Sequence, residues 1–107
     1  MEPSTTHCVE ISVSYRFAQE HHWIIQGITG FFSAYYMEKP GFRVLRNYEE
    51  LETGMHVWLC EIPSDMQVLK LLKRLQRDLP PFAVSERTTP GPTPITRYVI
   101  DFKEEKP

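Results

Sequence analysis

The segment VEISVSYRF, residues 9–17, alternates strictly between apolar and polar side chains. Its apolar members are Val9, Ile11, Val13, Tyr15 and Phe17. Because side chains of an extended chain point alternately to its two sides, this pattern predicts a β-strand with one buried and one solvated face. We therefore expect a sheet that is covered on one side.

Two helices are predicted further along the chain. Residues 19–37 carry apolar side chains at the spacing of a helix, and Pro40 ends that segment. The second helix is expected to begin near Ser64, a good N-cap residue, and to stop before Pro80 and Pro81. Its buried stripe comprises Val68, Leu71, Leu72, Leu75 and Leu79.

Four further segments have strand character, namely residues 42–48, 55–62, 82–88 and 95–102. The resulting order is β-α-β-β-α-β-β. It predicts an α+β fold, specifically a ferredoxin-like two-layer sandwich (β-α-β-β-α-β with an extra C-terminal strand) built on an antiparallel sheet. We expect one domain over residues 1–107, with residues 1–7 and 103–107 as frayed tails.

Composition narrows the classes of function. The chain has 107 residues, is 41% hydrophobic and has a net charge of −2, which suits one folded domain and gives no overall attraction to nucleic acid. The first residues do not resemble a signal peptide, and no segment is apolar enough to span a membrane. We expect a cytoplasmic protein without membrane contact, in which Cys8 and Cys60 are reduced thiols.

No motif for catalysis, cofactor binding or metal binding is present. His21 and His22 are adjacent and point in different directions on a helix, and the cysteines form no C-x-x-C pair. We therefore predict no catalytic residue, no metal ligand and no cofactor. Acid–base pairing of His56 with Glu61 or Glu10 across the sheet remains an open alternative.

The second helix carries an unusual run of cations opposite its apolar stripe: Lys70, Lys73, Arg74 and Arg77. Solvated helix faces usually mix charges of both signs. This face is therefore either an ordinary solvated helix face or a contact surface, whose partner would be an acidic protein or, as a less favoured alternative, the backbone of a nucleic acid.

Two other features indicate contacts between chains. The first helix has a second stripe, formed by Trp23, Gly27, Gly30, Ala34 and Met37, against which either the second helix or another subunit could pack. The strand at residues 55–62 is apolar on both sides, so either Val57 and Leu59 or Trp58 and Cys60 must lie on the open face of the sheet. A homodimer that pairs through the sheet is the favoured hypothesis.

These observations predict a non-catalytic binding or regulatory module that acts through protein–protein contacts and self-associates through its sheet. Its partner-binding residues are predicted to be Lys70, Lys73, Arg74, Arg77, Trp23 and Trp58. The Pro-rich loop at residues 89–94 is either a further contact or a passive connection. The alternative is a small ferredoxin-like enzyme or small-molecule binder, with a pocket lined by Tyr15, His21, Tyr35, His56 and Trp58. A second alternative is nucleic-acid binding through the basic face of the second helix.

Overall fold

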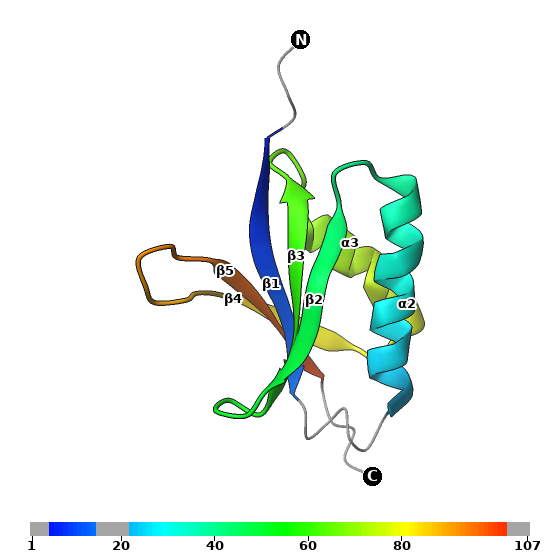
Figure 1. The fold of residues 1–107 in the computed structure, drawn as a ribbon. Coiled ribbons are helices and arrows are strands. Elements are labelled where there is room, and N and C mark those ends of the chain that lie inside the picture. The colour runs from blue at the N-terminus through cyan, green and yellow to red at the C-terminus, as the bar shows by residue number, and fades with distance from the viewer. Residues whose placement is uncertain (1–4, 15–21, 103–107) are drawn as a thin grey trace.

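The computed structural model describes residues 5–14 and 22–102 of the chain. The elements are β1 (Thr6–Ser14), α2 (His22–Glu38), β2 (Arg43–Glu50), β3 (Met55–Pro63), α3 (Val68–Leu75), a 3₁₀ turn (Gln76–Asp78), β4 (Phe82–Thr88) and β5 (Thr96–Phe102). The predicted α+β class and the order β-α-β-β-α-β-β are confirmed (Figure 1).

The sheet has five strands in the order β2-β3-β1-β5-β4. β1 is antiparallel to β3 but parallel to β5, so the sheet is mixed and the predicted antiparallel sheet is wrong. The topology also differs from a strict ferredoxin-like fold, because β5 folds back from β4 and inserts between β4 and β1.

Side-chain burial explains this insertion. Val99 and Ile100 are neighbours on β5 and point to opposite faces, yet they are only 2% and 0% exposed. On β4, by contrast, Phe82 is the one buried residue. A strand that is apolar on both sides gains most from an interior position, which leaves the more polar β4 at the edge.

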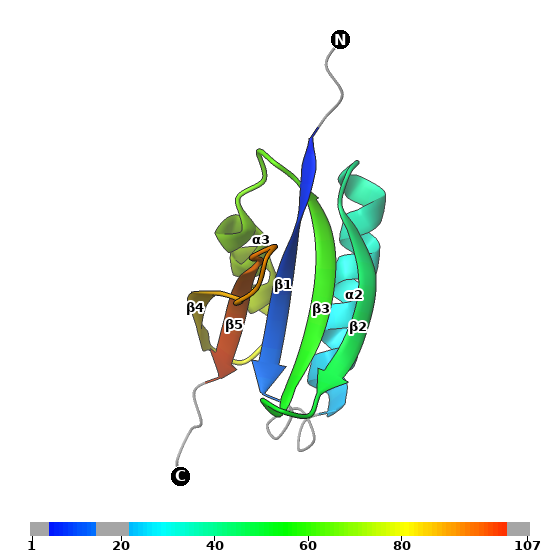
Figure 2. The ribbon, with the colours of Figure 1, turned by 60° about the vertical axis from the view of Figure 1, so that its left-hand side comes forward.

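Both helices cover one face of the sheet (Figures 1 and 2). In register across β1 and β3, Val9 lies opposite Cys60 and Ile11 lies opposite Trp58 on this covered face. From the helices, the core receives Ile24, Ile28 and Phe32 of α2 and Val68, Leu71, Leu72 and Leu75 of α3. Full burial of each large apolar side chain stabilises the fold by about 1.5–3 kcal/mol.

Several element boundaries differ from the expected ones. β1 begins at Thr6, because Thr6 and His7 pair with Pro63 and Ile62 and so are not part of a frayed tail. Residues 15–17 of the predicted first strand and residues 19–21 of the predicted first helix lie outside the described residues.

Ser64 is not the N-cap of α3. The helix begins at Val68 with Gln67 as its N-cap residue, which makes no side-chain capping bond. The Ser64 hydroxyl instead donates to the backbone oxygen of Thr5 at 2.8 Å, so it ties the start of β1 to the end of β3. At its other end α3 stops at Leu75, and the chain tightens into the 3₁₀ turn before Pro80.

Candidate interaction surface

The basic face consists of Lys70, Lys73 and Arg74 on α3 and Arg77 on the following 3₁₀ turn. All four residues are exposed, because α3 directs Val68, Leu71, Leu72 and Leu75 into the core and leaves the opposite side to solvent. Arg74 forms an ion pair with Glu38 at 3.4 Å. Within the part of the chain that the structure describes, Lys70, Lys73 and Arg77 have no carboxylate at ion-pair distance.

A shallow hollow of about 280 Å³ lies where the end of α2 meets the start of α3. Lys39, Lys70 and Arg74 line it together with a single carboxylate, Asp65. The Arg74 guanidinium lies 5.4 Å from the centre of the Tyr35 ring, so the aromatic wall of this hollow holds the cation in place. The hollow therefore extends the positive surface of α3 toward α2.

A second groove, of about 210 Å³, runs between α3 and the edge strand β4. Leu69, Leu72, Phe82 and Val84 make it apolar, and Lys73 stands beside it. Leu69 is 49% exposed although it is aliphatic, which sets it apart from the buried leucines of α3. The groove thus combines an apolar floor with a nearby cation.

The stripe of small residues on α2 is not covered by α3. Gly27, Gly30 and Ala34 are exposed, and Trp23 is 50% exposed. A Cβ atom added at Gly30 would meet no atom within 4 Å, and one at Gly27 would only reach Leu79 at 4.0 Å. Of the two alternatives for this stripe, packing of α3 along it is therefore wrong, and Trp23 faces outward.

Trp58, by contrast, is not accessible to a partner. It is fully buried on the covered face of the sheet, where its indole nitrogen donates to Thr29 Oγ1 at 3.2 Å. Of the two pairs considered on β3, Val57 and Leu59 therefore lie on the open face of the sheet.

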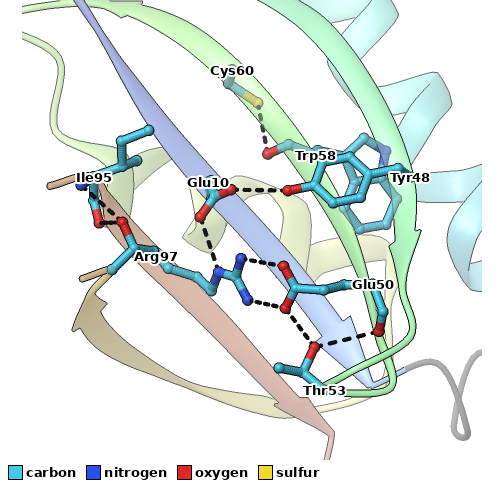
Figure 3. A network of polar contacts seen from close by, with 9 residues as sticks. Glu10, Tyr48, Glu50, Thr53, Trp58, Cys60, Ile95 and Arg97 are labelled. Atoms are coloured by element: carbon cyan, nitrogen blue, oxygen red, sulfur yellow. Dashed lines mark hydrogen bonds and ion pairs between the residues drawn. The ribbon is translucent and has the colours of Figure 1, made fainter. Parts of the chain in front are cut away.

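The open face carries an ionic network that sequence reasoning missed (Figure 3). The Arg97 guanidinium donates two hydrogen bonds of 2.8 Å to the two carboxylate oxygens of Glu50, and its Nε donates to Glu10 at 3.0 Å. The hydroxyls of Tyr48 and Thr53 donate to Glu10 at 3.1 Å and to Glu50 at 2.6 Å. The guanidinium of Arg97 on β5 therefore binds carboxylates from two other strands, β1 and β2.

This network requires a curved sheet. Arg97 lies on β5 and Glu50 on β2, with β1 and β3 between them. In a flat sheet these strands would be three spacings of about 4.8 Å apart, or roughly 14 Å, which is too far for a direct contact. The hairpin of β2 and β3 instead bends over the open face toward β5, as Figure 1 shows.

Two apolar side chains of the open face, Val57 and Val99, are already buried within the chain. Ser12 lies between Val57 and Val99 in the register of the sheet, and all three are at most 2% exposed. The exposed apolar patch that would favour face-to-face pairing of sheets is therefore absent at these three described positions.

Hydrogen bonding shifts the titration of the network. The hydrogen bonds from Arg97, with a further one from Thr53, lower the pKa of Glu50 to about 2. Desolvation, followed by the neighbouring charge of Glu10, raises the pKa of Tyr48. Glu50 is therefore ionised at neutral pH and Tyr48 keeps its proton.

The predicted pocket residues are not all placed together. Tyr15 and His21 lie outside the described residues. His56 and Tyr35 lie at opposite ends of a row of aromatic rings that runs through Trp58, Phe32 and Phe42. Side chains of the core fill the space between His56 and Tyr35.

His56 forms neither of the two acid–base pairs considered for it. It lies on the covered face of the sheet, whereas Glu10 and Glu61 lie on the open face. Among the described residues, neither ring nitrogen of His56 has a hydrogen-bond partner, and burial lowers the pKa of this histidine.

The remaining predicted features can be stated briefly. In the described ranges no three histidine, cysteine or acidic side chains gather as a metal site would require. Both cysteines are free thiols, and burial raises the pKa of Cys60 to about 12. Helices within the described ranges are too short or too polar to cross a membrane.

The Pro-rich loop at residues 90–94 is exposed beyond the β4–β5 hairpin, which Thr89 and Ile95 close by a backbone hydrogen bond of 2.9 Å.

Comparisons with protein families, with curated proteins and with solved structures find no match to this chain.

Proposed function

We propose that this protein is a non-catalytic binding or regulatory module that acts through protein–protein contacts and self-associates through its sheet. The observation that carries the proposal is the basic face, where Lys70, Lys73 and Arg77 are exposed and lack ion-pair partners among the described residues. The preferred partner is an acidic protein surface.

Electrostatics and apolar contact both support such a partner. A single exposed ion pair contributes only about 0–1 kcal/mol, so charges alone give a weak and salt-sensitive complex. They do, however, raise the association rate and exclude basic partners. Leu69, half-exposed beside the basic face, supplies the apolar anchor that an interface of useful affinity needs.

The alternatives have less support. A small enzyme or ligand-binding protein would need His56 to face a cavity with a carboxylate nearby, and His56 is packed against Trp58 at a ring distance of 4.6 Å. Nucleic-acid binding would use the same four cations, but the net charge of −2 opposes it. The experiment below separates this alternative from a protein partner.

The test is a variant with both charges reversed, Lys70→Glu with Arg77→Glu, compared with the wild type in capture experiments from an extract of the source cell. We expect proteins with acidic surfaces to be retained by the wild type, released by about 0.3 M salt and lost from the variant. A matched control reverses two exposed cations on β2, Arg43→Glu with Arg46→Glu, and should retain the same proteins.

A nuclease treatment and a binding assay complete the test. Fluorescence anisotropy with a labelled poly-glutamate peptide and with a labelled DNA oligonucleotide should show salt-sensitive binding to the peptide. Identical retention by wild type and variant, or retention that nuclease abolishes, would contradict the acidic protein partner.

A further inference from the structure

The two edges of the sheet differ in how well they are protected against pairing. The ladder between β2 and β3 is interrupted by a bulge between Val44 and Arg46, and charged residues surround it. β4 has no such irregularity, since each of its seven residues pairs in register with β5. Bulges and charges are the means by which proteins block an edge strand, so β4 is the less protected edge.

We propose that a second copy of this chain pairs with β4 in antiparallel orientation, with Ser85 of one copy opposite Ser85 of the other. The inference rests on the proposed function in that it specifies how the module self-associates. A two-fold axis perpendicular to the sheet relates the copies, so the helices of both lie on the same side of a continuous sheet.

The charges of β4 favour this register. With Ser85 on the axis, Val84 lies opposite Glu86 of the second copy, and Ala83 lies opposite Arg87 of the second copy. A shift that placed Glu86 on the axis would oppose two carboxylates, and a shift to Arg87 would oppose two guanidinium groups. The Ser85 register therefore avoids both repulsions.

The groove beside β4 supplies a further charge match. Val84 and Lys73 both line that groove. Because Glu86 of the second copy would lie opposite Val84 and on the same face, its carboxylate would come next to Lys73. By symmetry the contact occurs twice, and Leu69 of each copy would flank the junction between the two sheets.

Cysteine cross-linking tests the register directly. In a Cys8→Ser background, Ser85→Cys should form a disulfide-linked dimer, because opposite Cα atoms of antiparallel strands are about 4.5–5.5 Å apart. Ala83→Cys is the matched control. It lies on the same exposed strand and face. The two copies of residue 83 would be four residues apart along the strands, or about 13 Å, and should not link.

Charge exchange tests the Lys73–Glu86 contact. Sedimentation equilibrium should show that Lys73→Glu and Glu86→Lys each raise the dissociation constant of the dimer about tenfold, and that combining them restores it. Glu49→Lys, which makes the same charge change on β2, should leave the constant unchanged. The proposal would be overturned if the wild type is still a monomer at a concentration of about 100 µM. Equal cross-linking of Ser85→Cys and Ala83→Cys would overturn it as well.

The two proposals fail separately. Lys73 and Glu86 are not changed in the capture experiment, and Lys70 and Arg77 are not changed here. A protein that is monomeric but still captures acidic partners would overturn the β4 dimer and the proposed self-association, and would leave the acidic-partner proposal standing. Specific cross-linking at Ser85, together with unchanged capture by the Lys70→Glu with Arg77→Glu variant, would support the dimer and contradict the acidic partner.

Discussion

Arg97 illustrates how one residue can determine the shape of a sheet. Its side chain is only 12% exposed and holds Glu10 and Glu50, which lie 87 and 47 positions earlier in the chain. One guanidinium cannot neutralise two carboxylates. The Tyr48 hydroxyl therefore helps to stabilise the charge of Glu10 by donating a hydrogen bond to it. Each of these residues alone resembles an ordinary solvated side chain, which is why the sequence pattern does not reveal them.

Replacing Arg97 tests how much this network contributes to the free energy of unfolding. Arg97→Met should lower the free energy of unfolding by about 3–5 kcal/mol, because it leaves the buried carboxylate of Glu10 and the partly buried carboxylate of Glu50 without a counter-charge. Urea denaturation at pH 7 measures the change. Arg43→Met, which removes an exposed partner of Glu61, should cost less than about 1 kcal/mol.

A rescue variant distinguishes charge from packing. Adding Glu10→Gln and Glu50→Gln to Arg97→Met should recover part of the lost stability, since no buried charge then remains. No recovery would mean that Arg97 acts through shape alone.

The same network predicts a response to acid. The pKa of Glu50 is lowered from 4.5 to about 2 by its hydrogen bonds with Arg97 and Thr53. A lowered folded-state pKa contributes stability above the unfolded-state pKa, and this contribution is lost as pH falls from about 4.5 to about 2. Urea unfolding between pH 5 and pH 2 should therefore show a steeper loss for the wild type than for Glu50→Gln, and parallel curves would contradict the assignment.

At the scale of elements, α2 contains two glycines that its packing does not require. A Cβ atom at Gly30 would enter open space, and the backbone there is helical. Gly30→Ala should therefore raise the free energy of unfolding by about 0.5–1 kcal/mol. Gly54→Ala is the control. Gly54 has a φ of 69°, at which alanine is strained, so this variant should have a lower free energy of unfolding than the wild type.

The same variant also tests the exposed stripe around Trp23. If Gly30→Ala stabilises the protein but abolishes capture of its partners, the stripe belongs to the binding surface. Unchanged capture would restrict that surface to the basic face on α3 and the following 3₁₀ turn.

Periodicity in the sequence identifies the elements well and their ends less well. Alternation and helical spacing predict every described helix and strand, and the predicted range of β4 is the observed one. The start of α3 is predicted incorrectly. Ser64 has the chemistry of an N-cap residue, but its hydroxyl donates to Thr5 and does not cap the helix. Tertiary contacts of this kind are not visible in local sequence.

At the scale of the whole molecule, the strand order could not be predicted. A fifth strand can extend an edge or insert beside β1, and only the burial of Val99 and Ile100 on both faces of β5 distinguishes these outcomes. The basic face followed from helical spacing alone. The groove beside β4 did not, because it depends on which strand forms the edge.

The two thiols should report on opening of the whole structure. Cys60 is buried between sheet and helices, and its pKa is raised to about 12, whereas Cys8 is partly exposed. A thiol reagent at pH 8 should therefore modify Cys8 in the native protein and Cys60 only at the rate of unfolding. Mass spectrometry of the labelled peptides measures this, and rapid native labelling of Cys60 would contradict the packing described above.

The bulge beside Leu45 limits how far such a sheet can grow. Leu45 is 42% exposed where the ladder of β2 shifts, so this border offers an irregular template to an incoming strand. A dimer that pairs through β4, the other edge strand, would then have no regular free edge to which a further copy could add. If the proposed β4 dimer forms, we therefore expect a closed pair of subunits and not the open-ended stacking that leads to fibrils.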